Sequence, residues 1–170
     1  LKECPTANKC WARDMSRRFK QVCNGDFEPR FHLDRINHFP RWRTPQRIAT
    51  CFMGDLFGAW NDENKSAVQD ILDVVEGHPQ HQFLFLTKRP EALAKFNPWP
   101  LNTWVGTSLT GAETLEQQAA MLEALRQVEG AGVRWLSYEP ALRPLAQFIP
   151  QWVDWTVTGA QTGKGAIPFD

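Results

Sequence analysis

The sequence predicts an α/β fold, a partial (β/α) TIM-like barrel with parallel strands, from two observations. Short apolar runs alternate with amphipathic stretches along the chain, and this alternation is typical of βαβ units with right-handed crossovers. Each apolar run also stops at polar or glycine-rich residues. A closed eight-stranded barrel needs about 250 residues, so the 170 residues predict part of a barrel, and we expect the chain to be truncated at both ends.

Five short apolar runs, bounded by turn residues, are predicted to be buried strands. They lie at residues 47–53, 83–86, 103–106, 133–136 and 155–157. In a parallel sheet the ends of such strands lie on one edge, where α/β enzymes place their active sites. We therefore expect one shared mouth formed by Asp55, Lys88, Arg89, Ser108, Glu139 and Gln161.

The stretches between the apolar runs have helical spacing. Helices are predicted at residues 12–19, 62–76, 90–96 and 113–128, with a short helix or turn at 141–148. The stretch 113–128 is the clearest, because Leu115, Leu122 and Leu125 fall on one stripe and glycines at 130 and 132 stop the helix.

Composition limits the classes of function. Nineteen basic residues balance nineteen acidic ones, so no global field attracts the chain to nucleic acid or membranes. We expect a single domain over residues 1–170, in which 1–47 is a Cys-containing, Arg- and aromatic-rich N-terminal segment.

No apolar run suits a membrane span or signal peptide, so we expect a cytoplasmic protein without a membrane partner. A P-loop and a G-x-G-x-x-G motif are both absent from the sequence.

Three of the four cysteines precede residue 24, a clustering that indicates a metal or cluster site more than a disulfide framework. Cys4 and Cys10 are the candidate metal ligands, because they stand at the entry to the first predicted helix, where the dipole favours thiolate. The alternative is that Cys10 packs as a small apolar side chain. A zinc site that includes Cys23 is a weaker option, because the paired C-x2-C knuckles of structural zinc are missing.

Residues 26–47 form an irregular segment in which basic and aromatic side chains alternate between prolines. Such a segment can contact phosphates and stack on bases. The predicted nucleic-acid-binding residues are Arg41, Trp42, Arg43 and Arg47. The alternative is that these arginines are solvated or pair with neighbouring carboxylates.

Ordered motifs along nearly the whole chain resemble one family. They lie at residues 10–13, 18–19, 31–32, 35, 53–58, 83–90, 104–108, 137–140 and 159–163. The chain resembles the bacteriophage-protein family known as the gp-thirty-seven/sixty-eight family, a domain of unknown function allied to radical S-adenosylmethionine barrels and to spore photoproduct lyase. The resemblance implies a barrel, an iron–sulfur cluster and S-adenosylmethionine.

If the chain is an enzyme of the radical S-adenosylmethionine type, we expect the mouth residues at the strand ends to bind the cofactor or to position a substrate. Glu139 and Asp55 are the candidate catalytic residues, and Ser108, Lys88 and Gln161 are the candidate cofactor-binding residues. The structural alternatives are that Asp55 caps the next turn, that Lys88 belongs to a solvated rim and that Glu139 fixes the loop at the following proline. Gln161 stands where the family usually has a glutamate.

The cysteine pattern departs from that of radical S-adenosylmethionine enzymes, in which C-x3-C-x2-C supplies three thiolates. Cys10 matches the last position, Ala7 replaces the middle cysteine, and Cys4 is one residue out of register. We therefore expect a degenerate or truncated member that binds a cluster poorly or not at all. The alternative function is a non-catalytic barrel that binds nucleic acid or a protein partner through residues Arg30 to Arg47.

Overall fold

The computed structural model describes residues 10–20, 27, 31–32, 43–58, 65–146, 148–162 and 165–166. The chain divides into two compact units, Leu1–His32 and Leu33–Asp170. In the first unit, helix α1 spans Trp11–Arg18, which confirms the helix predicted at 12–19. Cys10 is the N-cap residue of α1, and its carbonyl accepts a hydrogen bond from the Asp14 amide at 3.2 Å.

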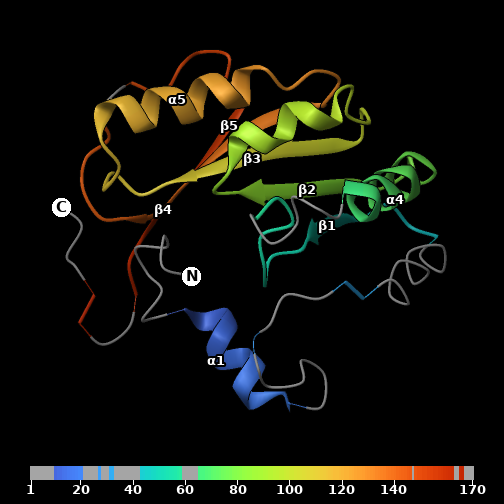
Figure 1. The fold of residues 1–170 in the computed structure, drawn as a ribbon, viewed down its shortest axis with the longest axis horizontal. Helices are drawn as coiled ribbons and strands as arrows, with labels where there is room; N and C mark the ends of the chain where they lie inside the picture. Colours follow the sequence, from blue (N-terminus) through green and yellow to red (C-terminus); the bar gives the residue numbers. More distant parts are fainter. Residues whose placement is uncertain are drawn as a thin grey trace. The chain divides into compact units, whose positions relative to one another are not determined.

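The second unit is built on five parallel strands (Figure 1). They are β1 (Arg47–Thr50), β2 (Gln82–Thr87), β3 (Thr103–Leu109), β4 (Val133–Ala141) and β5 (Trp155–Ala160). Each strand pairs with the next one in the sequence, in the order β1-β2-β3-β4-β5. Every crossover steps in the same direction along the sheet, and right-handed crossovers of this kind place their connections on one face. The sheet curls into a half-barrel, which confirms the predicted partial barrel.

Three helices follow the first three strands: α4 (Lys65–Glu76), the 3-10 helix η4 (Pro90–Phe96) and α5 (Leu115–Arg126). Helix α5 begins after Thr114, two residues later than predicted, because a capping box sets its start. Thr114 Oγ1 accepts from the Gln117 amide at 3.2 Å, and Gln117 Oε1 accepts from the Thr114 amide at 2.8 Å. The helical alternative at 141–148 is wrong for the described residues there, since Ala141 belongs to β4 and 142–146 are irregular.

One face of the sheet packs against the helices, and we call it the helix face. Its side chains include Phe83, Phe85, Leu109 and Leu136, each at most 1% exposed. Leu109 and Leu136 form a cluster with Leu122 of α5, and Figure 1 shows η4 and α5 along the same side of the strands. Burial of these apolar side chains stabilises the second unit.

The opposite face, which we call the inner face, carries three tryptophans. Trp155 lies 5.3 Å from Trp104 and 5.3 Å from Trp135, measured between ring centroids. The ring of Trp135 lies across Gly106, where an added Cβ would be 2.6 Å from Trp135 Nε1. Trp135 Nε1 then reaches the Phe85 carbonyl at 3.1 Å. A glycine at 106 is thus what allows a β4 side chain to lie flat over β3.

Candidate functional site

Strands β3 and β4 extend beyond their predicted ends, which changes where the candidate site lies. The apolar pattern of the sequence predicts that β3 ends at residue 106 and β4 at residue 136. In the structure the backbone pairing of the two strands continues further and pairs Ser108 with Ser137. Ser108 and Glu139 therefore belong to strands and not to loops. Because successive side chains of a strand point to opposite faces of the sheet, Ser108 and Glu139 both lie on the inner face, at the C-terminal edge.

Glu139 is held in place by the neighbouring strand. Its carboxylate lies over Gly159 of β5, where an added Cβ would come within 2.2 Å of Glu139 Oε1. Ser137 Oγ donates a long hydrogen bond, 3.4 Å, to Glu139 Oε2. Glu139 is exposed on its other side, so the sheet fixes an acceptor that remains open to a ligand.

Two hydroxyl groups accompany this carboxylate. Ser108 and Ser137 are 7% and 3% exposed and are direct neighbours in the β3–β4 pairing. Among the described residues, no side chain bonds to the Ser108 hydroxyl. A carboxylate beside two hydroxyls suits a ligand with ammonium or hydroxyl donors, because charge-assisted hydrogen bonds are the strongest that such a site can make.

Asp55 lies at the same edge but is already engaged. Its Oδ1 accepts from Thr87 Oγ1 at 2.8 Å and from the Phe57 amide at 3.0 Å, and its Oδ2 accepts from the Lys88 amide at 2.9 Å. These bonds join the loop after β1 to the end of β2. They give Asp55 a structural role, and its predicted catalytic role stays a prediction.

The remaining mouth residues come to the same edge. Lys88 is exposed and directly follows β2, and Gln161 is half-buried and directly follows β5. Arg89 Nε pairs with Glu91 Oε1 at 3.0 Å. The strand order thus gathers all the predicted mouth residues at one edge, while their chemical roles stay predictions. Sequence reasoning missed Ser137 and Gly159; the period-two spacing of Ser137 and Glu139 was the available signal.

The cysteines of the described residues do not form a metal site. Cys4 and Cys23 lie outside the described residues, and within them no group of three His, Cys, Asp or Glu side chains is placed to hold an ion. Cys51 is exposed as a residue, but burial of its thiol, with a smaller contribution from Asp55, raises its pKa to about 11. It is therefore a protonated thiol and a poor ligand at neutral pH. A cluster on Cys4 and Cys10 stays a prediction.

The basic segment is described only in part. Arg41 and Trp42 lie outside the described residues, while Arg43 and Arg47 are exposed. The Arg47 guanidinium lies 5.5 Å from the ring centroid of Trp104, an interaction that is favourable at this distance. Sequence reasoning missed this partner, because Trp104 lies two strands away. Arg47 thus has a packing role in addition to its predicted role in nucleic-acid binding.

Within the described part of the chain, no helix has the length and apolar character needed to cross a membrane.

Comparison with known proteins identifies the family alone. A family model described as "Protein of unknown function (DUF5131)" matches residues 2–170, and the chain therefore belongs to this family. No curated protein and no solved structure matches the chain.

Proposed function

We propose that the C-terminal edge of the half-barrel binds a small molecule with ammonium and hydroxyl donors, and that S-adenosylmethionine is the first candidate. The observation that supports this most is the Glu139 carboxylate, held over Gly159 and open to solvent. Parallel α/β sheets bind their ligands at this edge. The amino group and the ribose hydroxyls of S-adenosylmethionine are donors of the kind that Glu139 can accept.

The choice of S-adenosylmethionine rests on the resemblance to radical S-adenosylmethionine barrels, within a phage- or prophage-type protein. The described residues do not supply three thiolates, so no step of the proposal involves an iron–sulfur cluster. The proposal is limited to ligand binding. In it Glu139 orients the donor group of the ligand, while Ser108 and Ser137 bond its neighbouring polar atoms.

Isothermal titration calorimetry of the whole chain with S-adenosylmethionine tests this proposal. Glu139→Gln keeps the size of the side chain and removes its charge, and we expect affinity to fall about tenfold, since hydrogen bonds to charged groups are worth 1.5–3 kcal/mol. Glu129→Gln is the matched control, because Glu129 is also exposed but precedes β4, away from the site. Binding that is absent, or equally affected by both changes, contradicts the proposal.

Single-stranded nucleic acid binding through Arg41, Trp42, Arg43 and Arg47 is a second candidate function. The supporting observation is that Arg43 and Arg47 are both exposed. Phosphate contacts release counterions, so binding of a short oligonucleotide must weaken steeply with salt. A filter-binding titration without salt dependence, or without binding at low salt, rejects this function.

A further inference from the structure

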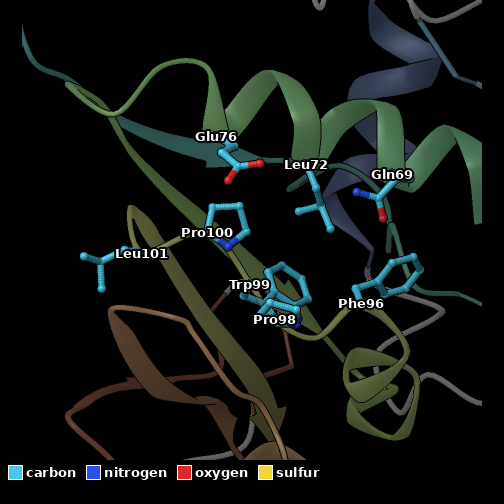
Figure 2. Close-up of a pocket in the computed structure, with 8 residues that line it drawn as sticks. All are labelled: Gln69, Leu72, Glu76, Phe96, Pro98, Trp99, Pro100 and Leu101. Atoms are coloured by element: carbon cyan, nitrogen blue, oxygen red, sulfur yellow. The ribbon is translucent and has the colours of Figure 1, made fainter.

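A groove lies on the helix side of the sheet, at the end opposite to Glu139. It is a cavity of about 190 Å³ between helix α4 and the segment that joins η4 to β3. Figure 2 shows Gln69, Leu72 and Glu76 of α4 on one wall and Trp99 and Pro100 on the other. The groove shares no residue with the mouth at the C-terminal edge.

The α4 wall presents hydrogen-bond acceptors to the groove. Gln69 Nε2 donates to Asp73 Oδ1 at 2.8 Å, which fixes the amide and leaves Gln69 Oε1 as the free acceptor, on the groove side in Figure 2. Glu76 stands seven residues further on, about 10 Å along the helix at 1.5 Å per residue. Leu72 lies between these two acceptors.

Glu76 stands at a position that helix stability does not favour. It is the last residue of α4, where the helix dipole disfavours a carboxylate. It is exposed, and no cation among the described residues pairs with it. The charge of Glu76 is therefore available to a partner.

The facing wall is apolar and offers no donor. Trp99 is 2% exposed, and its Nε1 already donates to the Leu93 carbonyl at 3.1 Å. Leu101, at the mouth of the groove, is 80% exposed. Leu72 and Trp99 are only 3% and 2% exposed, so the apolar surface open to a ligand belongs to residues such as Pro100 and Leu101. A groove that offers acceptors beside such surface, and no cation among its lining residues, is complementary to a side chain with an aliphatic stem and a cationic head.

We propose that this groove binds an arginine side chain from a partner protein, with an apolar neighbour of that arginine covering Leu101. The size of the cavity favours a single side chain, because sites for whole small molecules span about 300–1,000 Å³. Arginine fits better than lysine, because its planar guanidinium pairs with a carboxylate through two parallel bonds while further N–H groups stay free for another acceptor. Its stem packs against Pro100, which is half-buried.

Nuclear magnetic resonance titration of the labelled whole chain with acetyl-Leu-Arg-amide tests the proposal. We expect shifts at the Trp99 indole and at the amides of Leu72 and Leu101. Acetyl-Leu-citrulline-amide has nearly the same shape without the charge, and we expect it to bind about tenfold more weakly. Acetyl-Leu-Lys-amide is expected to fall between the two.

Glu76→Gln is expected to weaken arginine binding about tenfold and to leave the fold intact, because Glu76 is exposed. Asp70→Asn is the matched control: Asp70 lies on the same helix, is exposed and does not line the groove. If both variants lose the same affinity for the arginine peptide, the peptide is attracted only by the general negative charge of the helix, and the proposal is overturned. Shifts outside the groove, or equal affinity for the citrulline peptide, would also overturn it.

Discussion

The two faces of the same sheet are organised differently. On the helix face, Phe83 and Leu136 are fully buried at 0% exposure, whereas on the inner face Trp155 is 41% exposed and Glu139 is open to solvent. The helix face is fully buried and combines apolar side chains with the threonines at 87, 103 and 107. The inner face combines tryptophans with a polar row at its C-terminal edge. The comparison indicates that stability depends mainly on one face and that the candidate site lies on the other.

The inner face uses one arrangement for two purposes. A β4 side chain lies over a glycine of the neighbouring strand both at Trp135 on Gly106 and at Glu139 on Gly159. The first arrangement buries an indole to 3% exposure, and the second leaves a carboxylate exposed. Packing requires the first arrangement and gains little from the second, which supports the proposal that Glu139 binds a ligand.

The largest expected effect is on the helix face. Leu136→Ala removes a side chain that contacts Leu109 and Leu122, and we expect the free energy of unfolding to fall by about 2–5 kcal/mol. Urea denaturation followed by circular dichroism measures it. A loss below 1 kcal/mol would mean that the helix face is not the main source of stability.

Gly159→Ala is expected to affect stability less and the site more. The added Cβ would lie 2.2 Å from Glu139 Oε1, so the carboxylate must move, and we expect a stability loss of about 1–3 kcal/mol from overpacking. Affinity for S-adenosylmethionine should fall about as far as in Glu139→Gln. If the Gly159→Ala protein is folded and its affinity for S-adenosylmethionine is unchanged, Glu139 does not take part in binding this ligand.

Trp155→Ala probes the packing of the inner face by itself. A fully buried aromatic side chain contributes about 3–5 kcal/mol, but Trp155 is 41% exposed, so we expect a loss of about 1–2 kcal/mol. The same urea experiment measures it. A loss equal to that of Leu136→Ala would remove the difference between the two faces.

The next prediction concerns the reactivity of Cys51 and not the stability of the fold. Its pKa of about 11, against an ordinary 9.0, leaves about a hundredfold less thiolate at pH 8, since each pKa unit is a tenfold change. Iodoacetamide labelling read by peptide mass spectrometry should be correspondingly slow at Cys51 and accelerate as the pH rises toward 11. Asp55→Asn should increase the rate by removing the nearby negative charge. Fast labelling at pH 8 would show that the thiol is not buried.

The sequence predicts the strands and their parallel arrangement because apolar runs and βα alternation are local signals. The ends of β3 and β4 are not predictable in this way, since Ser108 and Ser137 extend the ladder through backbone pairing that their side chains do not reveal. The contact of Glu139 with Gly159 depends on the register between two strands, and the bond from Thr87 to Asp55 spans 32 residues. Neither follows from periodicity.

The most direct test of the central claim is a map of amide chemical shifts of the whole chain on adding S-adenosylmethionine. We predict that the largest shifts occur at Ser108, Ser137, Glu139 and Gly159, while helix-face residues such as Phe83 and Phe85 stay unchanged. Shifts confined to other parts of the chain, or no shifts at millimolar ligand, would contradict the claim that the polar edge of the inner face is the functional site.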